Sequence, residues 1–164
     1  MKQLTLIRHA TAAPALAGQA DWDRALEARG VRDAKKMGRW LHTQGSKPDL
    51  FMTSPALRAL DTAQHIAHEL GLPPSSVQKR ERLYLASPKD ILALICDVGG
   101  TASHVCIVGH NPGIGECADQ LSSERRIDNM PTCAVVRMEF DLAHWRDLGW
   151  NLGVSVEFDY PQKI

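Results

Sequence analysis

The pattern of hydrophobic and polar residues changes along the chain between short apolar runs and longer stretches with helical periodicity. The apolar runs predict strands at residues 3–8, 49–53 and 104–108, with a weaker, more charged strand candidate at residues 77–83. Apolar residues that recur every three or four positions predict helices over residues 26–44, 54–71, 88–98 and 112–121. Residues 133–140 and 152–158 are typical of two late strands, which could form a hairpin at a sheet edge.

The second predicted helix has the most detailed expectations. Ser54 is expected to supply an N-cap oxygen, with Pro55 in the first turn and Gly71 as the C-terminal stop. Its periodicity predicts an inner face made of Leu57, Leu60, Ala63, Ile66, Ala67 and Leu70.

Strands that alternate with helices predict an α/β fold in three layers, with a mostly parallel central sheet and helices on both faces. A length of 164 residues favours one domain over residues 1–164. In such folds, ligands bind outside the carboxyl ends of the strands, where the chain leaves the sheet. The sequence therefore indicates where its functional groups should meet.

Composition and charge narrow the possible partners. The formal net charge is zero, so no overall field favours nucleic acid or an anionic membrane as a partner. The apolar runs are far shorter than the ~18 residues that a membrane span needs, and the first residues lack a signal-peptide pattern. A cytoplasmic location is the default expectation. The four cysteines are widely spaced and are expected to be free thiols.

Cationic and titratable side chains follow three of the predicted strands. Arg8 and His9 follow the first, Arg58 lies one turn into the helix after the second, and His110 follows the run at residues 104–108. Each alone is more often structural or solvated, but jointly they predict a phosphate pocket at one sheet edge. The first turns of the helices near Pro55 and Pro112 would add backbone N–H groups and positive dipole ends.

Three segments carry a family resemblance. Leu6 to Ala10, Ser54 to Ala63 and Gly109 to Pro112 resemble motifs of the histidine phosphatase superfamily, whose fold is phosphoglycerate-mutase-like. Within that superfamily the chain is most similar to the short phosphohistidine phosphatases of the SixA type, and the resemblance runs from residue 2 to about residue 122.

The resemblance implies a reaction in which a histidine is transiently phosphorylated. His9 would be the nucleophile, and Arg8, Arg58 and His110 would hold the phosphoryl group, with His110 adding a donor if it is protonated. Arg24 and Asn111 would be further phosphate contacts, although a surface pair of Arg24 with Asp21 or Asp23 is a nearly equal alternative. No metal and no cofactor are implied.

Two departures from the family bear on the substrate. Ala10 replaces the glycine that usually follows the nucleophile, which favours the SixA-type branch. The stretch from Leu83 to Ser87 lacks the glutamate that serves many family members as general acid, so Asp21 and Asp23 remain as fallback acids. An alkoxide leaving group needs such an acid more than an imidazole does, and this favours phosphohistidine on a protein.

Alternative functions remain open. The first is a phosphomonoesterase with the same mechanism acting on a small phosphate ester, which would also release inorganic phosphate. The second is a phosphoprotein-binding module without hydrolysis. His65 and His68 are expected to lie on a solvated helix face, and Trp145 and Trp150 could either pack in the core or form a partner surface.

Overall fold

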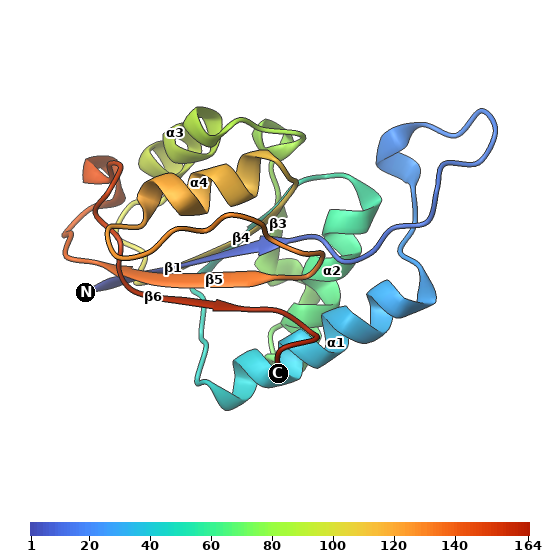
Figure 1. Ribbon diagram of the computed structural model, residues 1–164, viewed down its shortest axis with the longest axis horizontal. Coiled ribbons are helices and arrows are strands. Elements are labelled where there is room, and N and C mark those ends of the chain that lie inside the picture. The colour runs from blue at the N-terminus through green and yellow to red at the C-terminus, as the bar shows by residue number, and fades with distance from the viewer.

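A computed structural model describes residues 1–164 and contains six strands and four α-helices (Figure 1). The strands are β1 (Lys2–Arg8), β2 (Leu50–Thr53), β3 (Val77–Lys79), β4 (His104–Gly109), β5 (Val135–Phe140) and β6 (Val154–Asp159). The α-helices are α1 (Ala28–Thr43), α2 (Leu57–Glu69), α3 (Pro88–Val98) and α4 (Gly113–Leu121). Short 3-10 helices are η1 (Asp21–Asp23), η2 (Pro74–Ser76), η3 (Glu81–Leu83) and η4 (Trp145–Asp147).

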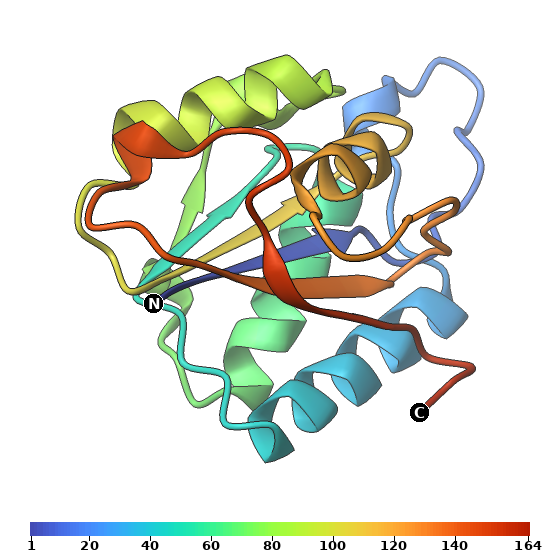
Figure 2. The same ribbon diagram turned by 60° about the vertical axis from the view of Figure 1, so that its left-hand side comes forward.

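The six strands form one sheet in the order β3-β2-β4-β1-β5-β6. The first four strands pair in parallel, and only β5 runs antiparallel to its two neighbours. Helices α3 and α4 cover one face of the sheet while α1 and α2 cover the other (Figures 1 and 2). The three-layer α/β fold is therefore confirmed, as is the hairpin of late strands at a sheet edge.

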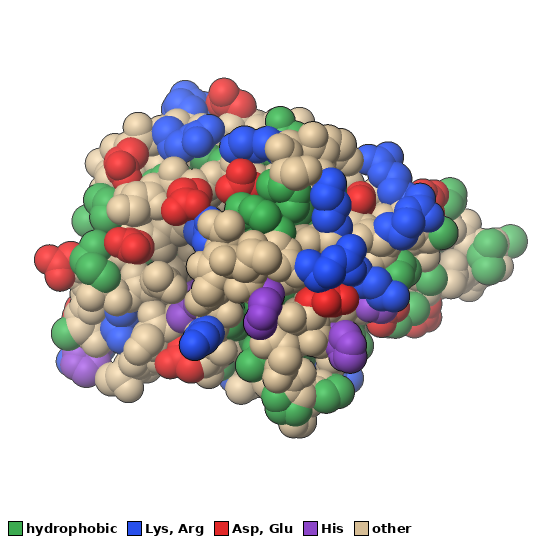
Figure 3. All heavy atoms as spheres, turned by 90° about the horizontal axis from the view of Figure 1, so that it is seen from below, with side chains coloured by type: hydrophobic (Ala, Val, Ile, Leu, Met, Phe, Trp, Pro, Cys, Tyr) green, Lys and Arg blue, Asp and Glu red, His purple; other side chains and the backbone are tan.

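Each face of the sheet has its own hydrophobic core. A cluster of 22 buried residues lies under α3 and α4 and includes Trp145, which has no exposed surface. Trp145 thus packs in the core, whereas Trp150 is 37% exposed. A cluster of 14 buried residues lies under α1 and α2, and Figure 3 shows Lys and Arg side chains on the outer surface of that side.

The start of helix α2 and the role of Ser54 differ from the prediction. It begins at Leu57 rather than near Pro55, and Ser54 does not cap it. The Ser54 hydroxyl oxygen instead accepts a hydrogen bond from the Ala56 amide and lies 2.8 Å from Nε2 of His110. The Ser54 hydroxyl therefore bonds within the turn before the helix and contacts His110, and it is not available to cap the first turn of α2.

The buried face of α2 is also rotated from the predicted one. Leu57 and Leu60 are only half-buried, while Arg58 and Thr62 point inward. Burial of these polar residues is tolerated because each has polar partners, which include the bond from the Thr62 hydroxyl to the Arg58 carbonyl at 2.7 Å.

The four cysteines are free, and three of them, Cys106, Cys117 and Cys133, are buried. Burial raises the pKa of Cys117 to about 12, which makes it an inert thiol at neutral pH. None of the helices combines the length and apolarity that a membrane crossing requires.

Gly113, the first residue of α4, provides a test of the packing next to His110. A Cβ atom at this position would lie 1.8 Å from the Ala86 carbonyl oxygen, so Gly113→Ala must displace backbone. We expect this variant to lose about 1–3 kcal/mol of unfolding free energy in urea titrations. Gly149→Ala is the control, since its Cβ would meet nothing closer than Leu152 at 3.6 Å. Equal stability of the two variants would contradict the close packing.

Candidate active site

The carboxyl ends of β1, β2 and β4 meet at one edge of the sheet. Arg8 lies beside Gly109 in the β1–β4 register, and the His9 amide donates a hydrogen bond to the Gly109 carbonyl at 3.0 Å. The rings of His9 and His110 lie 5.2 Å apart between centroids, and Nη2 of Arg58 lies 3.4 Å from Nδ1 of His110. The structure therefore brings together the groups that follow three different strands.

His9 is held in one tautomer. Its Nδ1–H donates to the carbonyl of Ala10 at 2.8 Å, a partner that the sequence did not identify. The Nε2 lone pair is thereby left free. Burial, together with the charges of Arg58 and Arg8, lowers the pKa of His9 to about 4, so the ring is neutral at pH 7. A neutral imidazole with a free Nε2 has the form that a nucleophile requires.

One threonine connects the His9 segment to α2. The hydroxyl oxygen of Thr62 accepts a hydrogen bond from the Ala10 amide at 3.0 Å and donates to the Arg58 carbonyl. Sequence reasoning missed Thr62, although its place four residues after Arg58 puts both on the same face of a helix. The link fixes the Ala10 peptide whose carbonyl orients His9.

Arg58 is 4% exposed and has an acidic partner from η1. Its Nη1 donates to the Asp21 backbone carbonyl at 2.9 Å, and its Nη2 donates to Asp21 Oδ2 at 3.0 Å. The Asp21 carboxylate also accepts bonds from Arg24 Nη1 at 3.2 Å and from the Tyr84 hydroxyl at 2.5 Å. Asp21 thus occupies donors that the sequence analysis assigned to a phosphoryl group.

These contacts decide the ionisation of Asp21. The hydrogen bond from Tyr84, reinforced by those from Arg58 and Arg24, lowers the pKa of Asp21 to about 2. Asp21 is a carboxylate at neutral pH and cannot donate a proton in this arrangement. Asp23 is exposed, and its side chain makes no hydrogen bond or ion pair with the site. The structure therefore supports neither residue as the acid.

Arg24 forms the surface ion pair that the sequence analysis gave as the alternative to a phosphate contact. It pairs with Asp21, and its Nε donates to the Ala13 carbonyl at 3.0 Å. Its charge is nevertheless close enough to His9 to contribute to the lowered pKa of that ring. Arg24 therefore borders the site, with the Asp21 carboxylate as its present partner.

His110 is neutral in this structure. Arginine can only donate, so Nδ1 of His110 is an acceptor toward Arg58, and Nε2–H donates to the Ser54 hydroxyl at 2.8 Å. Burial, followed by the effects of His9 and Arg58, lowers the pKa of His110 to about 3. The expectation of a protonated His110 applied only beside a bound phosphate, whose negative charge would raise this pKa.

Arg8 retains an unused donor. Its Nη1 donates to the Met130 carbonyl at 3.0 Å, while its Nε is buried without a hydrogen-bond partner. Burial lowers the pKa of Arg8 from its ordinary value, yet a guanidinium stays protonated in proteins. A buried, unsatisfied cationic donor is costly, and this Nε has too little exposed surface for a bound anion to contact it directly.

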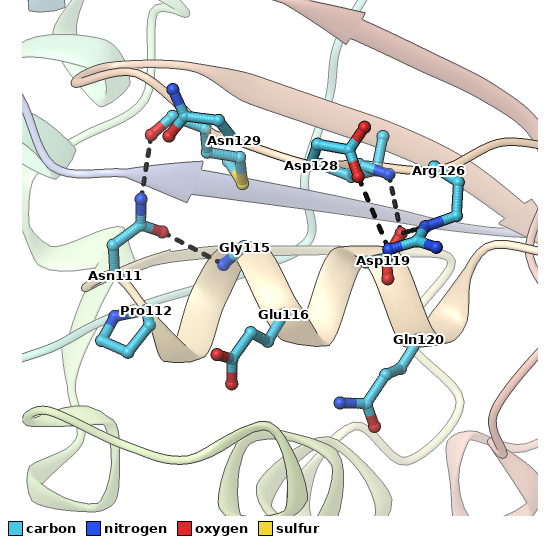
Figure 4. Close-up of a pocket in the computed structure, with 11 residues that line it drawn as sticks. Asn111, Pro112, Gly115, Glu116, Asp119, Gln120, Arg126, Asp128 and Asn129 are labelled. Carbon is cyan, nitrogen blue, oxygen red and sulfur yellow. Dashed lines mark hydrogen bonds and ion pairs between the residues drawn. The ribbon is translucent and has the colours of Figure 1, made fainter.

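Asn111 is placed away from the role predicted for it. Its Nδ2 donates to the Met130 carbonyl at 2.9 Å, and its Oδ1 accepts a bond from the Gly115 amide at 3.2 Å (Figure 4). Both polar atoms of the Asn111 side chain therefore form hydrogen bonds with backbone groups. Asn111 holds the Met130 segment against α4, and the Met130 carbonyl in turn positions Arg8.

A pocket of about 550 Å³ lies behind Asn111, between α4 and residues 126–130 (Figure 4). Its one cationic side chain, Arg126, is paired with Asp119 at 3.3 Å and with Asp128 at 3.5 Å. The pocket is distinct from the donors around His9 and contributes no free cation to them.

Tyr84 belongs to the site, although the sequence analysis gave it no role. It lies in the stretch from Leu83 to Ser87, which was noted only because it lacks a glutamate. Its ring meets that of His110 edge-on at 5.6 Å, and its hydroxyl contacts Asp21. No sequence signal identified it, because the contact depends on the turn that follows η3.

Possible metal ligands do not gather anywhere in the chain. No group of three or more His, Cys, Asp or Glu side chains is arranged to hold an ion. His65 is half-buried and His68 is exposed on α2, in keeping with a solvated helix face.

Comparisons with known proteins agree with this geometry. The family model of the histidine phosphatase superfamily (branch 1) matches residues 4–84. An uncharacterised protein of Mycobacterium tuberculosis is 30% identical over 154 residues, which cover 88% of this chain and 94% of that protein.

Two solved structures are similar over nearly the whole chain, and both proteins have been proposed to be phosphohistidine phosphatase SixA. The one from Agrobacterium tumefaciens is 25% identical with a TM-score of 0.79, and covers 95% of this chain and 97% of its own. The one from Nakamurella multipartitia is 26% identical with a TM-score of 0.74, and covers 98% and 96%. The chain therefore belongs to the histidine phosphatase superfamily, and within it the chain is similar to the SixA-type proteins.

Proposed function

We propose that this protein is a phosphatase in which His9 is transiently phosphorylated, and that its preferred substrate is phosphohistidine on a protein. The observation that carries the proposal is the state of His9. Its ring is neutral, is oriented by the Ala10 carbonyl, and stands beside His110 and the guanidinium groups of Arg8 and Arg58. The similarity to SixA-type proteins supports the same substrate class.

In the first step, the Nε2 lone pair of His9 attacks phosphorus. A P–Nε2 bond forms while the P–N bond of the substrate breaks, and the leaving imidazole nitrogen takes the electron pair. The leaving ring departs neutral when its other nitrogen already carries a proton. In the second step, water attacks phosphorus, the P–Nε2 bond breaks, and inorganic phosphate and neutral His9 are released.

The phosphoryl oxygens would be held by donors already in the site. Arg58 supplies a planar, permanently charged fork, and the guanidinium of Arg8 supplies a second positive charge close to His9. A dianion beside His110 would raise the pKa of that ring and could convert its Nδ1 into a donor. These cationic donors would neutralise the charge of the phosphoryl oxygens without a metal ion.

The substrate must replace Asp21 on Arg58. The carboxylate now holds Nη2 at 3.0 Å, which is the contact that a phosphoryl oxygen would make. Since the Asp21 side chain is 44% exposed, we expect its carboxylate to rotate away when an anion binds, while the bond from Arg58 Nη1 to the Asp21 backbone carbonyl keeps η1 in place. Asp21 and Asp23 are not proposed as acids.

The absence of an acid bears on the leaving group. A sugar alkoxide needs a proton in the transition state, and general acid catalysis is worth ~10²–10⁴ in rate. An imidazole leaving group whose other nitrogen is already protonated depends less on a general acid. The second candidate is a phosphomonoesterase acting on small esters through the same His9 chemistry. A binding module without hydrolysis is disfavoured, because binding alone does not require a neutral, oriented imidazole among the donors.

The substrate class can be tested by phosphate release in EDTA from a phosphohistidine protein and from a panel of sugar phosphates. We expect the phosphohistidine protein to be hydrolysed preferentially and His9→Ala to lose this hydrolysis, because the phosphoenzyme cannot form. Activity on small esters alone would reassign the substrate. Loss of activity in EDTA would contradict metal independence, and an active His9→Ala would contradict the mechanism.

The replacement of Asp21 by the substrate predicts tighter phosphate binding in Asp21→Asn. Removing the carboxylate frees Arg58 and Arg24, so the inhibition constant of inorganic phosphate should fall about 5-fold, the order of magnitude of one partly exposed ion pair. Asp23→Asn removes the same charge from the same segment and should leave the constant unchanged. Weaker phosphate binding in Asp21→Asn would show that Asp21 instead holds Arg58 in its working position.

A further inference from the structure

A cleft of about 570 Å³ opens beside the candidate site, outside the groups that hold phosphate. It is lined by Trp22 of η1, Pro55, Glu81 of η3 and Tyr84. Trp22 is 56% exposed, a large fraction for so large an apolar side chain. The mechanism described above uses none of the four.

The cleft is continuous with the phosphoryl donors through Tyr84. The ring of Tyr84 meets the His110 ring at 5.6 Å on one side and the Trp22 ring at 5.9 Å on the other. The aromatic contacts therefore run outward from His9 through His110 and Tyr84 to Trp22. A group attached to a phosphoryl group at His110 would find these aromatic surfaces next to it.

We propose that this cleft binds the leaving group of the substrate and selects a planar imidazole ring, with Trp22 and Glu81 as specificity-determining residues. The inference rests on the proposed function, since it assigns the part of the substrate beyond the phosphorus atom.

The lining of the cleft suits an imidazole in two ways. The indole of Trp22 and the phenol of Tyr84 offer aromatic surface for stacking or edge-to-face contact with a planar ring. Glu81 is exposed and makes no ion pair, so its carboxylate is free to accept a hydrogen bond from the ring N–H that does not carry phosphorus. The cleft contains no other charged side chain, which leaves few partners for the several hydroxyl groups of a sugar.

The test compares two phosphoramidates that share the P–N bond and differ in the ring. N-phosphoimidazole carries the ring and phosphoramidate does not. We expect Trp22→Ala to lower the ratio of their kcat/KM values about 5- to 10-fold, as for the loss of one aromatic contact, and Trp22→Phe to restore most of the ratio. Glu81→Gln should lower the ratio in the same direction, because a neutral amide is a weaker acceptor.

Trp150→Ala is the matched control, since Trp150 is 37% exposed and lines no cleft. It should leave the ratio at the wild-type value. A phosphohistidine protein assayed beside N-phosphoimidazole shows the source of the ring: equal effects of Trp22→Ala on both mean that the cleft binds the ring wherever it comes from. An effect on N-phosphoimidazole alone would overturn the assignment for protein substrates.

A binding measurement separates this inference from the proposed function. Imidazole is titrated into the protein in the presence of inorganic phosphate and followed by NMR. Binding that Trp22→Ala weakens and Trp150→Ala does not would support the cleft even if the wild type hydrolysed neither phosphoramidate, a result that would overturn the proposed function alone. An unchanged ratio together with Trp22-independent imidazole binding would overturn the cleft and leave the function of His9 standing.

Discussion

Parallel pairing of β1 with β4 sets the geometry on which the site depends. The register places Arg8 beside Gly109, so the next residues of the two strands, His9 and His110, leave the sheet side by side. The amide of His9 extends the ladder by one more bond to the Gly109 carbonyl. A slip of one residue would send buried strand side chains to the opposite core and separate the two imidazoles. The two hydrophobic cores, one on each face, therefore fix the site as well as the fold.

Burial then sets the charge state of the groups that the register brings together. His9 and His110 lie among guanidinium groups in a poorly solvated place, and both have strongly lowered pKa values. The arginines keep their charge. The result is a neutral nucleophile among fixed positive donors, with Asp21 as the anion that balances them in this structure. An anionic substrate that displaces Asp21 exchanges one charge-assisted contact for another, which limits the cost of emptying the pocket.

The layers of the fold and the convergence of Arg8, His9, Arg58 and His110 could be predicted because they follow from strand ends and helical periodicity. Several details could not. Ser54 looked like a helix cap, and only the tertiary structure shows its hydroxyl serving His110. Asn111 looked like a phosphate ligand, but its amide is used by backbone groups, one of them from the distant residue Met130. Tyr84 and the contact between Asp21 and Arg58 depend on how the exposed segments fold over the strand ends, and no periodic pattern encodes that.

The P–N bond to His9 is the central feature of the proposed mechanism, so direct capture of the phosphorylated protein tests it best. The protein is mixed with a radioactively labelled phosphoryl donor, quenched in alkali within one turnover, and digested for peptide mapping. We predict an alkali-stable, acid-labile label on the peptide that contains His9, and no label in His9→Ala. Label on His110 instead, or full turnover by the wild type with phosphate transferred directly to water and no labelled protein, would contradict the account.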